Sequence, residues 1–499
     1  MPPSKKLKIL FVTSEVAPFI KAGGLADVSA ALPQMLQELG HQVRIIVPKY
    51  GAIDEKKFKI HEVVRLKDLK TTIGKKEVIF SLRSSFLVSS KTRVQIYFLD
   101  NDEYFGSRHS LYADPIYNKD FQDNDERFIL LTHAVFELIQ KLGWVPDIIH
   151  SNDWQCGLVP AYLKLVYKDT EVFSKIKSLH TIHNLAFQGV FPKTSFAKTV
   201  LPKELENDKG ILQKGKLNFM KAGIKYADLL STVSGGYAKE ICSEKELALG
   251  LSDCLCYRKK EMHGIINGID DEVWNPRTDE FIPEKYGIRT LDHKKINKKA
   301  LAEKFGLEYN PNVPIIGMIS RLHDSKGFDL MIKSFKEMMD LNLNLIILGT
   351  GEREFHKFFE DAMFDYPAKF SCYLGFDNDL AHLIEAGADM FLMPSKFEAC
   401  GLNQMYSLMY GTVPIVRETG GLADTVTKFN EKLNTGNGFS FKNYESKAMI
   451  KEIKRAIKIY EQKKDVWSKI MKNGMKSEFS WINSAKNYID LYKNLIDHQ

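Results

Sequence analysis

The chain has 499 residues, of which 44% are hydrophobic and 27% charged, and its 70 Lys and Arg against 63 Asp and Glu give a formal charge of +7. These values are typical of a water-soluble globular protein and unlike those of a disordered or membrane-spanning one. The basic and acidic residues are mixed along the sequence, so the excess charge does not indicate nucleic acid but suits an anionic small molecule. A chain of this length exceeds what one hydrophobic core usually supports, which predicts two large domains.

The start of the chain and its cysteines bear on the compartment. MPPSKKLKIL lacks the apolar core and cleavage site of a secretion signal, which predicts a cytoplasmic protein. Six cysteines are sparse in so long a chain and form no CxxC pair. We therefore expect neither a disulfide framework nor a structural zinc site.

The first half of the sequence alternates strand-like and helix-like segments. Residues 7–16 predict a buried strand, 25–40 a helix ended by Gly40, and 41–48 the next strand, which together make a βαβ unit. Further strands are predicted at 94–100, 147–151, 178–184 and 228–234.

A second series of strands begins at residue 313. Strands are predicted at 313–320, 343–349, 370–375, 389–395 and 412–418, with amphipathic segments between them. This alternation predicts an α/β fold with parallel sheets covered on both faces, in which ligands lie beyond the carboxyl ends of the strands. The Gly, Asn, Asp and Pro content of 264–276 marks the hinge between the two domains, and we expect a deep cleft between them.

One short sequence, GGLAD, occurs at 23–27 and again at 420–424. Each copy is predicted to lie just after a strand and to open a helix. A double glycine there lets a ligand approach the backbone, and the helix start aims N–H groups at an anion. Either copy alone could be an ordinary tight turn, but two copies in corresponding places favour a diphosphate site.

Charged residues follow the strands of the second series. Arg321 and Lys326 come after the strand at 313–320 and could hold a diphosphate and neutralise its charge as it leaves. For a single Arg or Lys, a surface salt bridge is the alternative. Glu398 could accept hydrogen bonds from sugar hydroxyls or could stabilise a helix dipole as an N-terminal carboxylate. Cys400 has no base nearby in the sequence and is predicted to be a packed residue.

Polar residues followed by aromatics end two strands of the first series. Asp153 and Trp154 follow one strand, and His183 and Asn184 end the next. Carbohydrate sites combine hydrogen-bonding side chains with aromatic faces in this way, so the four residues predict a sugar site.

At these segments the sequence resembles the bacterial glycogen synthase and plant starch synthase family over nearly its whole length. The shared motifs, in the family's order, are SEVAPFIKAGGLADV, NDWQCGLVP, HNLAFQG, TVSGGYAKEI, GIINGID, ISRLHDSKGFDL, LGTGE, FEACGLNQMYSLMYG and TGGLADTV. The resemblance implies a retaining glucosyltransferase with two Rossmann-like domains (a GT-B fold), ADP-glucose as donor, an α-1,4-glucan as acceptor and no metal or other cofactor. It implies an acceptor-side domain at 1–262, a nucleotide-sugar domain at 263–480 and a final helix at 481–499 that crosses back to the first domain.

The resemblance also implies roles for residues at the motif positions. The expected catalytic residues are His183, Glu398, Arg321, Lys326 and Asp153. The expected donor-binding residues are Lys21, Gly23, Gly24, Asn184, Asn267, Gly420, Gly421 and Leu422. The expected acceptor-binding residues are Glu15 and Trp154.

The sequence departs from the family's usual pattern at three positions. Ala22 stands in KxGGL where many members have Thr or Val, Gln155 replaces the common His after DW, and Ala399 replaces the common Pro after Glu398. These changes affect fine contacts. Tyr406 stands where many other retaining glycosyltransferases have a second Glu. A Tyr at this position is usual in the family that the sequence resembles.

Three alternatives remain beside the ADP-glucose enzyme. The same chemistry could use UDP-glucose. A silent glucan-binding protein with the same fold is a second alternative, although it would be expected to have lost charged residues that this chain keeps. A nicotinamide dehydrogenase would need GxGxxG after the first strand, where this chain has KAGGLAD.

Overall fold

The computed structural model describes residues 6–114, 117 and 119–497. The chain forms two units. The N-terminal unit consists of the chain up to Val233, residues 238–265 and the segment from Trp481 onwards, and the C-terminal unit consists of residues 234–237 and 266–480.

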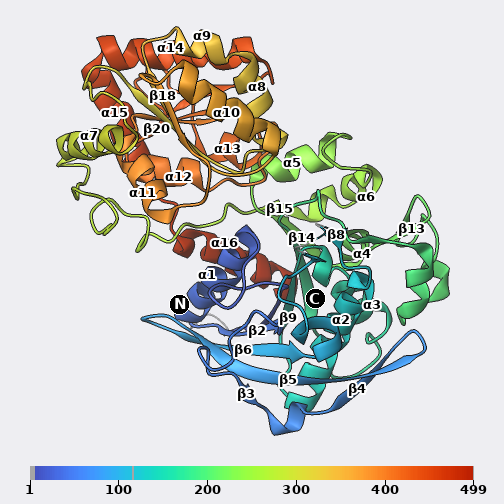
Figure 1. Ribbon diagram of the computed structural model, residues 1–499. Coiled ribbons are helices and arrows are strands. Elements are labelled where there is room, and N and C mark those ends of the chain that lie inside the picture. The colour runs from blue at the N-terminus through green and yellow to red at the C-terminus, as the bar shows by residue number, and fades with distance from the viewer. Residues whose placement is uncertain (1–5, 115–116, 118, 498–499) are drawn as a thin grey trace. The chain divides into compact units, whose positions relative to one another are not determined.

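The N-terminal unit is built on a 10-stranded sheet in the order β15-β14-β10-β9-β1-β2-β6-β5-β3, with β4 paired to β5 (Figure 1). All predicted strands of the first half are present in it. Its strands are β1 (Lys8–Val12), β2 (Gln42–Pro48), β3 (His61–Glu62), β4 (Leu69–Ile73), β5 (Lys76–Val88), β6 (Arg93–Asp100), β9 (Ile148–Asn152), β10 (Lys177–Ile182), β14 (Leu229–Thr232) and β15 (Met262–Gly264).

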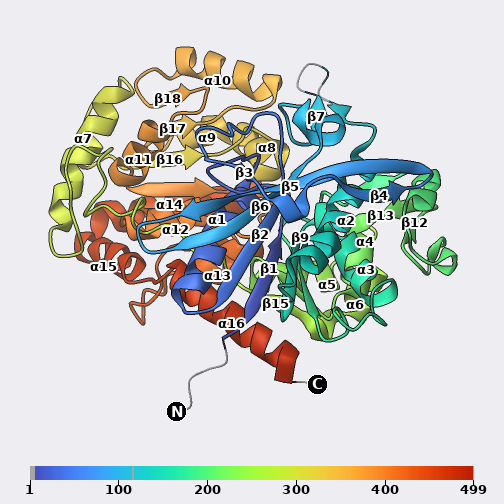
Figure 2. The ribbon, with the colours of Figure 1, turned by 90° about the horizontal axis from the view of Figure 1, so that it is seen from below.

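The direction of the crossovers determines which face of the N-terminal sheet a helix covers. The step from β1 to β2 runs one way along the sheet, whereas the steps from β6 to β9 and on to β10 run the other way. Because parallel crossovers are right-handed, α1 belongs to one face and α2 and α3 to the other. The helix α16 lies beside α1 (Figure 2). The helices are α1 (Gly24–Glu38), α2 (Asn124–Leu142), α3 (Leu158–Leu165), α4 (Phe219–Tyr226), α5 (Gly235–Ser243), α6 (Ser252–Tyr257) and α16 (Trp481–Asp497).

The prediction of a parallel sheet is wrong at one edge of the N-terminal unit. There β5 pairs antiparallel with β6, and β3 and β4 pair antiparallel with β5. Much of β5 alternates between buried and exposed residues, which is typical of an antiparallel strand with one solvated face. That alternation lies in the stretch between the predicted strands, 49–93, where no strand was expected.

The C-terminal unit contains a 6-stranded sheet in the order β18-β17-β16-β19-β20-β21, and every pair in it is parallel. Both faces are buried: Ile316 and Met318 pack on one side and Ile315 on the other. The five predicted strands of the second series are confirmed and a sixth follows them. They are β16 (Ile315–Ile319), β17 (Asn344–Leu348), β18 (Phe370–Tyr373), β19 (Met390–Met393), β20 (Val413–Arg417) and β21 (Phe439–Phe441).

Helices cover both faces of this second sheet. One hydrophobic cluster joins the sheet to α8, α9, α10, α14 and α15, and another joins it to α7 and α11. The helices are α7 (Lys294–Lys304), α8 (Phe328–Lys333), α9 (Phe335–Met339), α10 (Arg353–Asp365), α11 (Asn378–Gly387), α12 (Asn403–Met409), α13 (Gly420–Thr425), α14 (Ser446–Gln462) and α15 (Lys464–Met475).

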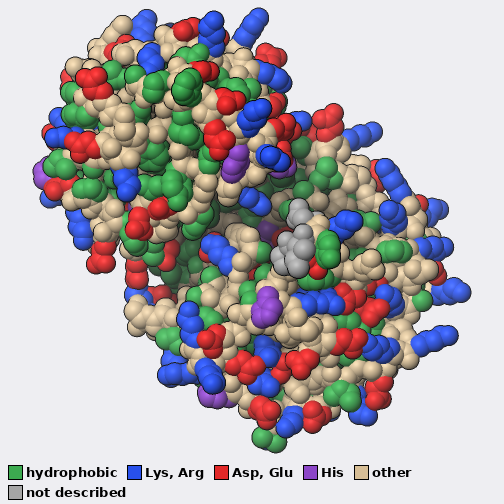
Figure 3. Space-filling view, viewed as in Figure 1, with side chains coloured by type: hydrophobic (Ala, Val, Ile, Leu, Met, Phe, Trp, Pro, Cys, Tyr) green, Lys and Arg blue, Asp and Glu red, His purple; other side chains and the backbone are tan. Residues whose placement is uncertain are grey.

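The surface agrees with the mixed charge pattern of the sequence. On the face seen in Figure 3, Lys and Arg side chains lie among Asp and Glu side chains over each unit. Among the described residues, no helix is both long enough and apolar enough to cross a membrane.

Candidate functional site

The strand order of the C-terminal unit reverses between β16 and β19, which are neighbours in the sheet. In such sheets ligands bind beyond the carboxyl ends of the strands at the point of reversal. Arg321 and Lys326 follow β16, and Glu398 follows β19. The fold therefore brings three of the predicted residues to one edge of this sheet.

An ion pair joins two of them. The Nζ atom of Lys326 lies 2.6 Å from Oε2 of Glu398, and the two side chains are 27% and 11% exposed. Ser395 donates a 3.3 Å hydrogen bond to the same carboxylate oxygen. Lys326 ends a 3₁₀ turn, and Gly327 after it has a φ of 82°. A Cβ at Gly327 would lie 2.2 Å from the carbonyl oxygen of Pro394, so a glycine is needed where this turn meets the segment before Glu398. Arg321 is exposed two residues beyond the end of β16.

The second GGLAD copy packs against the segment that carries Glu398. A Cβ at Gly420 would lie 1.9 Å from the carbonyl oxygen of Glu398, and one at Gly421 would lie 2.2 Å from that of Cys400. The N–H of Gly421 donates to the carbonyl oxygens of Glu398 and Ala399 at 3.3 and 3.2 Å. These two motifs therefore form one structure, and only glycine fits at the contact. We call the group of Asn267, Arg321, Lys326, Glu398, Gly420, Gly421 and Leu422 the C-terminal site.

Two further predicted residues complete this site. Leu422 is fully buried, and Asn267 is 8% exposed. The backbone of Asn267 donates a hydrogen bond to Cys400, whose pKa burial raises to about 12. Cys400 is therefore a packed thiol, as predicted, and not a nucleophile.

In the N-terminal unit the strand order reverses between β1 and β9. Glu15 follows β1, Asp153 follows β9, and His183 and Asn184 follow the next strand, β10. Burial raises the pKa of Asp153, and the nearby charge of Glu15 adds to this effect. We call Glu15, Lys21, Gly23, Gly24, Asp153, Trp154, His183 and Asn184 the N-terminal site.

The first GGLAD copy differs from its prediction. It does not come directly after its strand, because residues 13–23 separate the end of β1 from α1. Glu15 holds this connection: its Oε2 accepts hydrogen bonds from the N–H groups of Ala22 and Gly23 at 2.5 and 2.9 Å. Lys21 is exposed and pairs with Asp27 at 2.8 Å. A Cβ at Gly24 would meet nothing within 4 Å, so this backbone is open where that of Gly420 is closed.

Tyr112 belongs to this neighbourhood and was not predicted. Its hydroxyl lies 2.8 Å from Oγ of Ser14 and 3.3 Å from Oε1 of Glu15. Its carbonyl oxygen accepts a 2.8 Å hydrogen bond from the side chain of Asn124 at the start of α2. Neither periodicity nor a motif marks residue 112 in the sequence.

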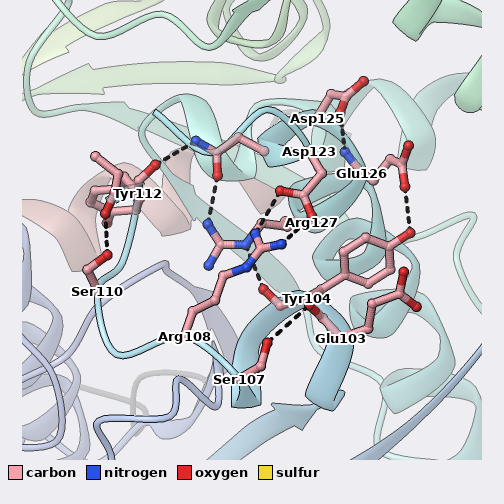
Figure 4. Close-up of polar contacts among 12 residues, drawn as sticks. Glu103, Tyr104, Ser107, Arg108, Ser110, Tyr112, Asp123, Asp125, Glu126 and Arg127 are labelled. Carbon is pink, nitrogen blue, oxygen red and sulfur yellow. Dashed lines mark hydrogen bonds and ion pairs between the residues drawn. The ribbon is translucent and has the colours of Figure 1, made fainter. Parts of the chain in front are cut away.

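The segment before Tyr112 is anchored to α2 by two arginines (Figure 4). Arg108 forms a two-pronged ion pair with Asp123, with both distances 2.7 Å. Arg127 is fully buried and donates to the carbonyl oxygens of Tyr104 and Leu111 at 2.7 and 2.8 Å. Burial lowers the pKa of Arg127, although aromatic rings surround its guanidinium. The segment that presents Tyr112 to Glu15 is thus held in place from within the core.

Asp153 combines an unusual backbone with an unusual ionisation. Its φ of 54° lies in the region that residues other than glycine rarely adopt. Its Oδ1 accepts hydrogen bonds from the N–H groups of His183 and Asn184 at 2.7 and 3.3 Å. Burial nevertheless raises the pKa of Asp153 to about 7. Strain and a perturbed pKa at one residue are typical of functional sites.

His183 is held as a neutral imidazole. Burial lowers its pKa to about 3, and its Nε2 lies 2.9 Å from Oδ1 of Asn152. Because the Asn152 oxygen can only accept, Nε2 carries the proton. Asn184 accepts a 3.0 Å hydrogen bond from the N–H of Ala186, which orders the loop after β10.

Trp154 lies in an aromatic cluster and is only 8% exposed. Its ring is 4.9 Å from that of Phe128 and 6.3 Å from that of Tyr112. A Cβ at Gly189 would lie 2.2 Å from the indole, so the loop after β10 closes over the ring. Trp154 therefore supports the site mainly by packing, and its contact with an acceptor stays a prediction.

The two sites offer cations, carboxylates and backbone N–H groups. Among the described residues, no group of three or more His, Cys, Asp and Glu is placed to hold a metal ion. Arg321 and Lys326 carry cations of the kind that bind anions, and Glu398 and Asp153 carry carboxyl groups of the kind that hydrogen-bond hydroxyls.

Two family models match the chain: a starch synthase catalytic domain over residues 8–257 and glycosyl transferases group 1 over 300–473. A glycogen synthase from Desulforudis audaxviator is 40% identical over 501 residues, covering 99% of this chain and 97% of that protein. The chain belongs to the glycogen and starch synthase family. It is a glucosyltransferase of glycogen or starch synthesis.

Solved structures agree with this assignment. The catalytic domain of starch synthase IV from Arabidopsis thaliana, bound to ADP and acarbose, has a TM-score of 0.86 and 28% identity, with 99% of this chain and 100% of that chain covered. A sucrose-phosphate synthase from Thermosynechococcus elongatus has a TM-score of 0.58 at 15% identity, covering 99% and 100%, and shows the fold alone. The predicted GT-B class with two Rossmann-like domains is confirmed, and the predicted cleft between the domains stays a prediction.

Proposed function

We propose that this glucan synthase uses ADP-glucose and transfers its glucose to the non-reducing end of an α-1,4-glucan with retention of configuration. The bond between C1 of glucose and the diphosphate oxygen breaks, a bond to an acceptor hydroxyl oxygen forms, and ADP and the proton of that hydroxyl leave. The observation that carries the proposal is the Lys326 and Glu398 pair at the reversal of strand order, packed against Gly420 and Gly421.

We assign the C-terminal unit to the donor. Arg321 and Lys326 bind the diphosphate and offset the negative charge that grows on it as the bond to glucose breaks. Glu398 accepts hydrogen bonds from the glucose hydroxyls. The backbone at Gly420, Gly421 and Leu422 lies against the phosphates, and Asn267 contributes to donor binding.

We assign the N-terminal unit to the acceptor and to the reacting sugar. His183, neutral with its proton on Nε2, lies close to that sugar, and Asp153 and Asn184 lie beside it. Glu15 and Trp154 support the acceptor side. Lys21, Gly23 and Gly24 approach the donor through the open backbone of the first GGLAD copy. The six cysteines are all free, which suits the reducing cytoplasm that we propose as the compartment.

The experiment is to measure release of ADP and UDP from the two glucose donors, with and without glycogen, for wild type and Lys326→Ala. We expect glycogen-dependent ADP release that the variant reduces by about 10²-fold or more, because a preorganised charge is removed. Release of UDP alone would move the proposal to UDP-glucose. Release from neither donor would favour a silent glucan-binding protein.

A further inference from the structure

The first turn of α12 contains a buried amide side chain that the proposed reaction does not use. Gln404 is fully buried. Its Nε2 donates to the carbonyl oxygens of Cys400 and Gly401 at 3.1 and 3.0 Å and lies 3.2 Å from Oγ1 of Thr425. One side chain thus reaches both the segment after Glu398 and the end of α13.

Thr425 continues this connection into the second GGLAD copy. Its hydroxyl donates to the carbonyl oxygen of Gly421 at 2.7 Å. Because that hydroxyl hydrogen is used, the Thr425 oxygen can only accept from Gln404, whose two Nε2 hydrogens are shared among the three oxygens. Gly421 in turn donates through its N–H to the carbonyl oxygens of Glu398 and Ala399. The contacts form a closed ring through the Glu398 segment, Gln404, Thr425 and Gly421.

The ring requires an amide at position 404. Two carbonyl oxygens and a hydroxyl oxygen face Nε2, so the side chain must donate hydrogen bonds, and an ionised carboxylate of the same shape would only accept. A side chain of similar size without polar hydrogens would take the Gln404 hydrogen bond from the carbonyl oxygen of the buried Cys400 and from that of Gly401. The neighbouring Asn403 donates to the carbonyl oxygen of Ile319 at 2.7 Å, at the end of the strand that leads to Arg321.

We propose that Gln404 is the positioning residue of the C-terminal site, which holds Glu398 and the start of α13 at a fixed separation so that both face the same donor. This inference rests on the proposed function, since it is the donor that needs both groups together. Figure 1 shows α12 and α13 within the unit that carries them. The positioning acts through the closed ring of hydrogen bonds and not through contact with the substrate.

A purely structural role for Gln404 predicts a different result. It would lower the free energy of unfolding while leaving the kinetics of the folded enzyme unchanged. Positioning predicts that the folded variant loses kcat and donor affinity, because a displacement of about 1 Å at a reacting centre can cost about 10²-fold in rate. The glucan KM should not change in either case.

The test compares Gln404→Met and Gln404→Glu with one control at another position and with a matched pair of variants at Thr425. Gln462→Met is the control for Gln404→Met, since Gln462 is exposed at the end of α14. Thr425→Val removes the hydroxyl of the ring and Thr425→Ser keeps it. Two readouts are measured on folded protein: hydrogen exchange of peptides covering 398–404, 420–428 and 446–462, and kcat and KM for donor and glucan.

For Gln404→Met we expect faster exchange at 398–404 and 420–428 but not at 446–462, and a fall in kcat/KM for ADP-glucose of about 10- to 100-fold. Gln404→Glu should lose more kcat/KM than Gln404→Met, and Thr425→Ser should keep a kcat/KM near that of wild type. The double variant Gln404→Met with Thr425→Val should lose less kcat/KM than the losses of the two single variants combined. Unchanged exchange at 420–428, or wild-type kcat/KM in folded Gln404→Met, would overturn the positioning role.

The exchange readout separates this inference from the proposed function. If wild type transfers glucose from neither ADP-glucose nor UDP-glucose but Gln404→Met still loosens both peptides, the proposed function fails while the hydrogen-bonded ring stands as a structural link, and positioning for catalysis is overturned. If wild type transfers glucose and the variant does so equally well, the proposed function stands and the inference fails.

Discussion

Lys326 and Glu398 are separated by 72 residues in the sequence, yet Nζ of the one lies 2.6 Å from Oε2 of the other. The contact exists because β16 and β19 are neighbours at the point where the strand order reverses. The carboxylate and the ammonium neutralise each other before a donor arrives. If Lys326 binds the diphosphate as proposed, the diphosphate must compete with Glu398 for it, and the hydroxyls of the donor glucose would then hydrogen-bond to the released carboxylate.

Replacing Glu398 by Gln tests this exchange. Gln keeps the shape but removes the charge, so we expect kcat for glucan synthesis to fall by about 10²- to 10³-fold, as when one preorganised polar group is lost from an active site. Binding of ADP should be as tight as in wild type or tighter, because Lys326 is no longer neutralised. Steady-state kinetics and calorimetric titration with ADP measure the two effects.

The control for this variant is Glu337→Gln. Glu337 also forms an ion pair, with Lys454 at 2.7 Å, but both side chains are about half exposed. Exposed pairs contribute little, so its kinetics should match wild type. Weaker ADP binding in Glu398→Gln would contradict the exchange.

The two GGLAD copies should respond differently to alanine. Gly420 has a φ of 43° and no room for a Cβ, so Gly420→Ala should displace the Glu398 segment, lower the midpoint of thermal unfolding and abolish activity. At Gly24 a Cβ meets nothing within 4 Å at the start of α1, so Gly24→Ala should fold as well as wild type. If the donor approaches this backbone as proposed, Gly24→Ala loses activity without losing stability. Full activity in Gly24→Ala would remove Gly24 from the donor site.

Tyr406 lies in a stack of three rings in the C-terminal unit. The ring of Trp274 is 3.8 Å from His382 on one side and 4.0 Å from Tyr406 on the other, and both pairs are nearly parallel. His382 is fixed by a 2.8 Å contact with Asp279. Trp274→Ala should lower the free energy of unfolding by about 3 kcal/mol, the usual cost of removing a packed aromatic side chain.

Urea denaturation checks this value, with Trp274→Phe and Phe364→Ala beside it. Phe keeps part of the stack and should lose only about 1 kcal/mol. Phe364 is 87% exposed, so its replacement should change the free energy of unfolding by less than about 0.5 kcal/mol. Equal values for Trp274→Ala and Phe364→Ala would show that the stack contributes nothing.

The sequence predicted most of the fold because its parallel strands are buried on both faces. Such strands are continuous apolar runs bounded by polar residues, as in β16 and β17, whose boundaries were predicted within about two residues. The end of β1 was predicted at residue 16, whereas the strand ends at Val12. The edge strands β3 and β4 are short or half exposed, and β5 alternates between apolar and polar residues. Their pairing depends on the neighbour that each one meets, which no local pattern encodes.

The candidate site could be predicted only as a set of strand ends. Lys326 and Glu398 were both placed after strands, but their contact depends on the order of the strands in the sheet, which the sequence does not state. Tyr112 and Gln404 were missed for a related reason. Each acts through residues distant in sequence, Glu15 for the one and Thr425 for the other, and neither stands in a pattern that marks such a contact.

Asp153 should make stability depend on pH. Burial raises its pKa to about 7 in the folded protein, whereas the unfolded chain has the ordinary value of 3.8. Between about pH 4 and pH 7 the folded state therefore holds a proton that the unfolded state has lost. Lowering the pH through this window should raise the free energy of unfolding by at most about 1.4 kcal/mol per pH unit from this residue, and the gain is absent above pH 7.

Asp153→Asn isolates this contribution. The Asn oxygen can still accept from the N–H groups of His183 and Asn184, and Asn tolerates a positive φ better than most residues. We expect the variant to be more stable than wild type above pH 7, with the difference shrinking as the pH falls toward 4, and to have lost any step near pH 7 in kcat/KM. Urea denaturation from pH 5 to pH 8 gives the difference between the two proteins. Parallel curves would mean that Asp153 ionises at its ordinary pKa and that its carboxylate is already charged at pH 5.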